Sequence, residues 1–250
     1  MSDKYSPPQS PKKKFLYETH LHTAPVSRCA SAGVRKSLLF YKALGYDGVF
    51  ITNHFIDGNC SADRSLSYEE RIEYYFSAAE EGKKMAKEIG IKVFEGVESS
   101  HQGSDFLIYG LYKEWYLAHP EIMEMKKSEA LTLMANEGAL IIQAHPFREH
   151  RSTDRISLFP RYVHGAEIYN ANQGDFNNEM ALHYAKSYEL IPTAGSDNHS
   201  AKIRHLGGME SDEPIESEAD FVRMVKSGEL TPFKLVLSEE ELSAIAPQVT

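Results

Sequence analysis

The stretch Phe15-Leu16-Tyr17-Glu18-Thr19-His20-Leu21-His22 begins with apolar residues and ends in two histidines one residue apart. Side chains on a β-strand alternate between its two faces, so both imidazoles point to the same side of such a strand. Two imidazoles on one face can bind a single cation, but such a pair also occurs as hydrogen-bonded histidines without a metal. The stretch therefore predicts a strand that ends either at a metal site or at a structural histidine pair.

The same arrangement, an apolar run followed by polar residues that can bind metals, recurs along the chain. The later runs end at Asn53-His54, Gly96-Val97-Glu98, His145-Pro146, Asn170 and Ser196-Asp197-Asn198-His199. Helical patterns lie between the runs, as in residues 72–86, where apolar side chains recur at three- and four-residue spacing after a capping box at Ser67. The alternation predicts an α/β protein with a mostly parallel sheet. In such proteins, catalytic residues gather at the carboxyl ends of the strands.

Composition and charge limit the classes of protein to which the chain can belong. No linker rich in Pro, Gly or Ser divides the interior of the 250 residues, so we expect a flexible tail over residues 1–14 and a single domain over residues 15–250. The formal net charge of −9 disfavours long nucleic acids as partners. No apolar run reaches the roughly 20 residues of a membrane span, and the first residues lack the apolar core of a signal peptide. We therefore expect a soluble cytoplasmic protein without a membrane partner, and the oligomeric state stays open.

Five motifs, taken in order, resemble those of the polymerase and histidinol phosphatase (PHP) family. They are His20-Leu21-His22, Thr52-Asn53-His54, Gly96-Val97-Glu98, Ala144-His145-Pro146 and Gly195-Ser196-Asp197-Asn198-His199. The resemblance implies a distorted seven-stranded (β/α)7 TIM-like barrel of the PHP type, with two or three divalent metal ions (Zn, Mn or Fe) at the carboxyl ends of its strands. It also implies hydrolysis of phosphate esters by a metal-bound hydroxide, which closely spaced cations can hold at neutral pH.

The resemblance further implies a role for individual residues. The metal ligands that it predicts are His20, His22, Glu98 and Asp197 on a first metal, Glu98 and His145 on a second, and His54 and His199 on a third. Glu98 would bridge two cations, because a shared carboxylate keeps them close and reduces their repulsion. Glu98 is therefore the residue on which the predicted catalysis depends.

The chain departs from the family pattern at three places. Arg28 and Cys29 stand where members often have an Asp or His on the third metal, which leaves three alternatives: a weak third site, Cys29 as its ligand, or the Arg28 guanidinium in place of the metal. Asp105 stands where the second metal often has another histidine, and we predict Asp105 as a ligand, with His101 as the alternative. Asn53 replaces the usual Asp before the third-motif histidine, and its amide oxygen lends an imidazole less basicity than a carboxylate does.

Two arginines are the predicted contacts of the substrate. Arg148, close after the His145-Pro146 motif, is the predicted phosphate ligand, and Arg28 is predicted to help neutralise the developing charge. Glu167 and Asn170 have either an orienting or an ordinary structural role. The predicted substrate is a small phosphomonoester, namely a nucleotide, sugar or amino-alcohol phosphate. The alternatives are a metal-dependent hydrolase of C–N or C–O bonds and a noncatalytic PHP module that stabilises a partner protein.

Overall fold

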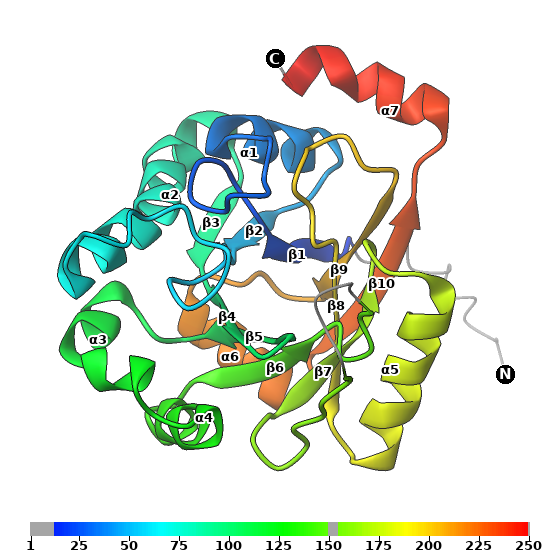
Figure 1. Ribbon diagram of the computed structural model, residues 1–250. Coiled ribbons are helices and arrows are strands. Elements are labelled where there is room, and N and C mark those ends of the chain that lie inside the picture. The colour runs from blue at the N-terminus through cyan, green and yellow to red at the C-terminus, as the bar shows by residue number, and fades with distance from the viewer. Residues whose placement is uncertain (1–12, 150–154, 250) are drawn as a thin grey trace, which may run out of the picture.

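Ten strands and seven α-helices follow one another in the described part of this computed structural model, residues 13–149 and 155–249 (Figure 1). Residues 1–12, 150–154 and 250 lie outside this part, and so does most of the tail predicted over residues 1–14. The strands form two five-stranded sheets. None of the helices in the two described ranges combines the length and the apolar character that a membrane crossing requires.

The first sheet has the strand order β10-β9-β1-β2-β3. Its strands are β1 (Phe15–Leu21), β2 (Gly48–Ile51), β3 (Lys92–Glu95), β9 (His205–Ser211) and β10 (Leu230–Val236). The helices α1 (Val34–Ala43) and α2 (Tyr68–Ile89) connect β1, β2 and β3, which are parallel. The capping box predicted at Ser67 is confirmed: the Ser67 hydroxyl accepts from the Glu70 backbone N–H, and the Glu70 carboxylate accepts from the Ser67 N–H.

The second sheet has the strand order β4-β5-β6-β7-β8. Its strands are β4 (Val97–His101), β5 (Ser104–Tyr109), β6 (Leu140–Ala144), β7 (Gly165–Asn170) and β8 (Ile191–Gly195). The remaining helices are α3 (Lys113–Ala118), α4 (Lys127–Asn136), α5 (Asp175–Ser187), α6 (Glu218–Lys226) and α7 (Glu239–Ile245). In Figure 1 the strands lie in the middle of the molecule, and α1 to α5 lie around them.

The predicted seven-stranded (β/α)7 TIM-like barrel is wrong, because the strands of the described residues form two sheets and no closed barrel. The expected mostly parallel sheet is also wrong, since four strand pairs are parallel and four are antiparallel. One cause lies in the two-residue connection between β4 and β5, where Gln102 and Gly103 have φ of 50° and 86°. So short a connection can join only antiparallel strands.

The two sheets face each other across an aromatic core and meet at strand ends. Phe50 of the first sheet packs against Tyr109 of the second sheet and Phe221 of α6, with ring centroids 5.4 and 4.2 Å apart. The Thr19 hydroxyl of β1 donates a 2.7 Å hydrogen bond to the Ala194 carbonyl of β8. Strands from both sheets therefore end beside one another, and their terminal polar residues share one space.

Candidate metal centre

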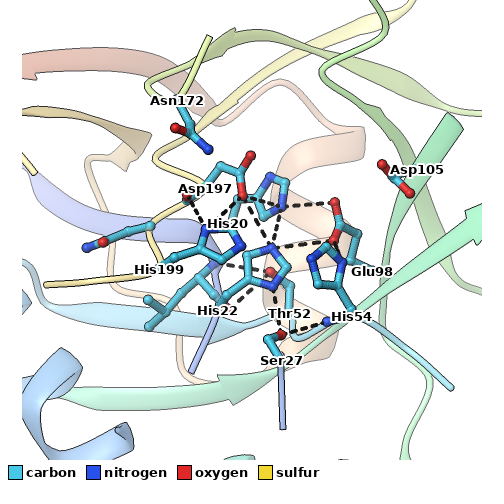
Figure 2. A network of polar contacts seen from close by, with 12 residues as sticks. His20, His22, Ser27, Thr52, His54, Glu98, Asp105, Asn172, Asp197 and His199 are labelled. Carbon is cyan, nitrogen blue, oxygen red and sulfur yellow. Dashed lines mark hydrogen bonds and ion pairs between the residues drawn. The ribbon is translucent and has the colours of Figure 1, made fainter. Parts of the chain in front are cut away.

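A buried cluster of imidazoles and carboxylates lies where the strand ends of the two sheets meet (Figure 2). No member is more than 9% exposed, and the members are His20, His22, His54, Glu98, His145 and Asp197. Charged groups are buried at this depth only when they are paired or bind an ion, because desolvation of a charge costs several kcal/mol. The first question is therefore what balances the charges in this cluster.

The imidazoles of His20 and His22 point at one place, as the strand pattern predicts. Their Nε2 atoms lie 3.1 Å apart. The Glu98 Oε1 atom lies 3.3 Å from Nε2 of His20, and the Asp197 Oδ1 atom lies 3.3 Å from Nε2 of His22. Four potential ligand atoms thus converge within the span that one small cation can bridge.

Ser27 determines which nitrogen of His22 faces this place. The Ser27 hydroxyl donates to Oδ1 of Asn53 (2.8 Å) and accepts from the backbone N–H of His54 (3.0 Å). Its single proton is then committed, so Nδ1 of His22, 2.9 Å away, is the donor of their hydrogen bond. Burial lowers the pKa of His22 to about 3, so the ring is neutral and its Nε2 carries a free lone pair.

Glu167 has the corresponding role for His20. Its Oε1 lies 3.0 Å from Nδ1 of His20, and its Oε2 accepts from the His145 backbone N–H (3.0 Å) and from the Asn170 side chain (2.8 Å). A carboxylate only accepts, so Nδ1 of His20 donates and Nε2 faces the cluster. The geometry therefore favours the orienting role for Glu167 and Asn170 over an ordinary structural one.

Glu98 lies at the middle of the cluster. Its Oε1 is 3.2 Å from Nε2 of His145, and its Oε2 is 2.5 Å from Nδ1 of His54. Burial raises the pKa of Glu98, but His54, followed by other imidazoles around the carboxylate, outweighs this effect and lowers the pKa well below its usual value. The position of Glu98 between imidazoles on both sides is the arrangement that a bridging carboxylate requires.

The cluster fits a metal on the evidence of its buried polar atoms. Oε2 of Glu98 and Nδ1 of His54 are buried, and neither has a hydrogen bond of acceptable geometry within residues 13–149 and 155–249, although the two atoms lie close. Burial lowers the pKa of His20, but Glu167 and Asp197 outweigh it and hold the pKa well above its usual value. The carboxylates of Glu167 and Asp197 thus attract positive charge to the point where the lone pairs converge. The groups of His, Asp and Glu side chains around this point suggest divalent metals.

The other predicted ligands lie on either side of this point. The ligand atoms of Glu98, Asp105 and His145 lie within 4.8 Å of one another, as do those of His22, His54 and His199. The alternative ligand His101 is in none of these groups and lies edge-on to the Phe159 ring. The structure thus brings Asp105, rather than His101, to the second position.

The two predicted substrate arginines differ in placement. The Arg28 guanidinium donates to the Cys60 carbonyl at 3.3 Å and does not border the cavity of the site. Arg148 borders the cavity, and its Nη2 lies 2.5 Å from Oδ2 of Asp105. The cavity has a volume of about 450 Å³, and its lining consists of polar residues: Cys29, His54, Asn59, Ser100, Asp105, Arg148, Asn172, Gln173, Asp197 and His199.

Arg28 and Cys29 both depart from the family pattern, and of the two only Cys29 borders the cavity of the site. It borders the cavity beside His54 and His199. Partial burial raises the pKa of its thiol, but contacts with the imidazoles of His199 and His54 outweigh this effect and bring the pKa to about 6.

Sequence reasoning missed two residues that support the ligands, Ser27 and Glu18. Oε1 of Glu18 accepts from the backbone N–H groups of His20 (2.7 Å) and Ser196 (2.9 Å), which joins the ends of β1 and β8. Burial raises the pKa of Glu18 to about 7. A signal existed for Glu18, because the alternation of side chains on β1 places it on the same face as His20 and His22. The contacts of Ser27 depend on the folded loop and have no local signal.

Comparison with known proteins gives one family match and several structural ones. Residues 176–230 match the family described as PHP-associated. No curated protein sequence matches the chain. The similar solved structures include a two-domain protein from Bacteroides vulgatus that contains a predicted PHP-like metal-dependent phosphoesterase, with a TM-score of 0.62 and 13% identity over 93% of this chain and 69% of that one.

Two further structures cover nearly the whole of both chains. PsfC from Pseudomonas syringae has a TM-score of 0.59 and 14% identity over 94% of this chain and 96% of that one. An amidohydrolase from Chromobacterium violaceum has a TM-score of 0.53 and 12% identity over 90% of this chain and 99% of that one. At these identities the structural matches show the fold. The family match over residues 176–230 and the shared fold both support a PHP-domain protein.

Proposed function

We propose that this protein is a metal-dependent phosphoesterase that hydrolyses a small phosphomonoester. The observation that carries the proposal is the convergence of ligand atoms from His20, His22, Glu98 and Asp197 on one buried point, with the outer nitrogens of both histidines held by hydrogen bonds. The fold is shared with the Bacteroides vulgatus structure described as containing a predicted PHP-like metal-dependent phosphoesterase, which supports the same reaction class.

The centre that we propose contains two or three divalent cations, with Zn, Mn or Fe as the candidates. Such cations would supply Lewis acidity and lower the pKa of a water molecule at the phosphorus atom. Glu98 would bridge two of the positions, with His145 and Asp105 completing the second. Glu167 and Ser27 would keep His20 and His22 in the orientation that presents Nε2.

A small substrate suits the cavity that borders this centre. Its volume of about 450 Å³ lies within the range of small-molecule sites. Arg148 would bind the phosphate, because it borders the cavity and its guanidinium carries the positive charge that attracts a phosphate. The neutral side chains of Asn172 and Gln173 on the cavity wall would hydrogen-bond to the remainder of the substrate.

Hydrolysis of a C–N bond is the second candidate function. The Chromobacterium violaceum structure that shares the fold is described as an amidohydrolase, and a metal centre of this kind does not determine the leaving group. The third possibility, a noncatalytic module that stabilises a partner protein, accounts poorly for the complete set of converging ligand atoms.

The test compares metal-loaded protein on p-nitrophenyl phosphate, on a phosphodiester and on an amide substrate. We expect the monoester to be hydrolysed fastest, and Glu98→Gln to lower the rate at least about 100-fold, since even residues that merely orient ligands contribute 10- to 100-fold. Glu95→Gln is the matched control, because Glu95, the last residue of β3, pairs with Lys83 of α2 and is not a member of the cluster. Full metal-dependent turnover by Glu98→Gln would exclude the bridging role, and a faster amide reaction would favour the second candidate.

A further inference from the structure

Cys29 occupies a fixed place at the edge of the metal centre. It lies on the loop between β1 and α1, and hydrogen bonds on both sides hold this loop. The backbone N–H of Arg28 donates to the Asn59 carbonyl at 3.0 Å, and that of Ser31 donates to the His199 carbonyl at 2.7 Å. The chain on either side of Cys29 is thus tied to the segments that follow β2 and β8, which carry His54 and His199.

Two imidazoles, those of His54 and His199, border the same cavity as Cys29. His54 and His199 pack on the ring of His22, with centroids 4.3 and 4.2 Å from it. Nδ1 of His199 lies 2.9 Å from the Asp197 carbonyl, and because a carbonyl only accepts, this nitrogen is the donor and Nε2 keeps its lone pair. His54 is 9% exposed, and its Nδ1 faces Oε2 of Glu98 at 2.5 Å, so Nε2 is the nitrogen of this ring that remains for a ligand on the cavity side.

We propose that the Cys29 sulfur, together with His54 and His199, binds the outermost cation of the centre. This inference rests on the proposed metal centre, and it is independent of the substrate. On binding, the thiol releases its proton to the solvent and the sulfur enters the coordination sphere as a thiolate. The other residue that the sequence leaves for this place, Arg28, is excluded because its guanidinium donates to the Cys60 carbonyl instead.

A thiolate ligand also determines which metal this position prefers. Thiolate and imidazole ligands suit Zn²⁺ and Co²⁺, whereas Mn²⁺ and Mg²⁺ prefer carboxylate and water oxygens. The inner positions combine imidazoles with the carboxylates of Glu98, Asp105 and Asp197. We therefore infer that the outermost position selects Zn²⁺ over Mn²⁺, while the inner positions accept either ion.

Cobalt spectroscopy tests the ligand directly and requires no substrate. Protein stripped of metal is titrated with Co²⁺, and the thiolate-to-cobalt charge-transfer absorption in the near ultraviolet is recorded. The variants are Cys29→Ser and, as a matched control, Cys60→Ala, since the sequence has only these two cysteines. We expect the absorption in the wild type and Cys60→Ala and its loss in Cys29→Ser, with the visible bands of the remaining cobalt retained. Absence of the absorption from the loaded wild type, or its persistence in Cys29→Ser, would overturn the proposal.

A second measurement uses the wild type alone, in case Cys29→Ser does not fold. Cys29 is exposed in the structure, so iodoacetamide can reach it, and the modified peptide is quantified by mass spectrometry. We expect saturating Zn²⁺ to slow alkylation of Cys29 at least about tenfold, equal Mn²⁺ to have little effect, and a chelator to restore the rate. An alkylation rate that Zn²⁺ leaves unchanged contradicts the proposal. Failure of the protein to hydrolyse any phosphoester would leave both readouts intact, so the two proposals fail separately.

Discussion

Replacing Ser27 with alanine tests how the His22 imidazole is held in the metal centre. The buried hydroxyl joins three groups: Nδ1 of His22, Oδ1 of Asn53 and the backbone N–H of His54. Asn53 Oδ1 retains the Thr23 backbone N–H at 2.6 Å, so its loss is small. The other two groups are donors that Ser27→Ala leaves buried without this partner.

The structure gives the size of the expected effect. An unsatisfied buried donor costs about 1–3 kcal/mol, so two donors predict a loss of roughly 2–6 kcal/mol in the free energy of unfolding. Loss of the hydrogen bond that orients His22 also predicts about a 10- to 100-fold weaker metal affinity. Both effects have the same origin and are expected to appear together in Ser27→Ala.

Urea denaturation of metal-free protein in the presence of a chelator measures the first effect, and metal titration measures the second. Ser37→Ala is the matched control, because Ser37 is equally buried but its hydroxyl has no hydrogen-bond partner within the described residues. We expect the control to change the free energy of unfolding by less than about 1 kcal/mol. The reasoning is refuted if Ser27→Ala matches the control in both stability and metal affinity.

Three further predictions follow from the cluster and its surroundings. Gly195→Ala would place a Cβ 2.5 Å from the Cβ of His20, so we expect it to lower the free energy of unfolding by about 1–3 kcal/mol and to weaken metal binding. The control Gly174→Ala, whose Cβ would have nothing within 4 Å, should change both little, and equal effects of the two variants in urea denaturation would contradict this account. Chelation should lower the thermal midpoint and metal should restore it, because ligands that bind only the folded state stabilise it; calorimetry that shows no shift would argue against the metal centre. Burial lowers the pKa of His164, so the folded state resists protonation, and stability should fall as pH drops below 6.5, by at most about 1.4 kcal/mol per pH unit. His164→Asn should reduce this slope in urea denaturation across pH, and an unchanged slope would contradict the assignment.

Much of the candidate site could be predicted because its residues obey local rules. The two-residue period of a strand places His20 and His22 on one face, and Glu98, His145 and Asp197 come at or near strand ends. The position of these residues at the ends of apolar runs was enough to expect them in one place. The structure brings together the predicted metal ligands, including Asp105 from β5, which was expected only from the family resemblance.

The rest depended on contacts between distant segments. The barrel prediction failed because the turn at Gln102 and Gly103 reverses the chain within the second sheet. The chain passes from the first sheet to the second at Gly96, between β3 and β4, which no pattern in the sequence indicates. The Ser27 hydrogen bonds and the Arg148–Asp105 pair join residues far apart in sequence, which no periodicity indicates. Arg28 was expected at the site, but its guanidinium found a carbonyl partner on the neighbouring loop.

Anomalous diffraction from crystals grown with Zn²⁺ or Mn²⁺ tests the central claim, that this buried cluster is a metal centre. Data collected at the absorption edge of the added ion locate it without reference to activity. We predict a peak about 2.0–2.3 Å from the ligand atoms of His20, His22, Glu98 and Asp197. Crystals that take up the ion at surface sites while the cluster shows no peak would contradict the account.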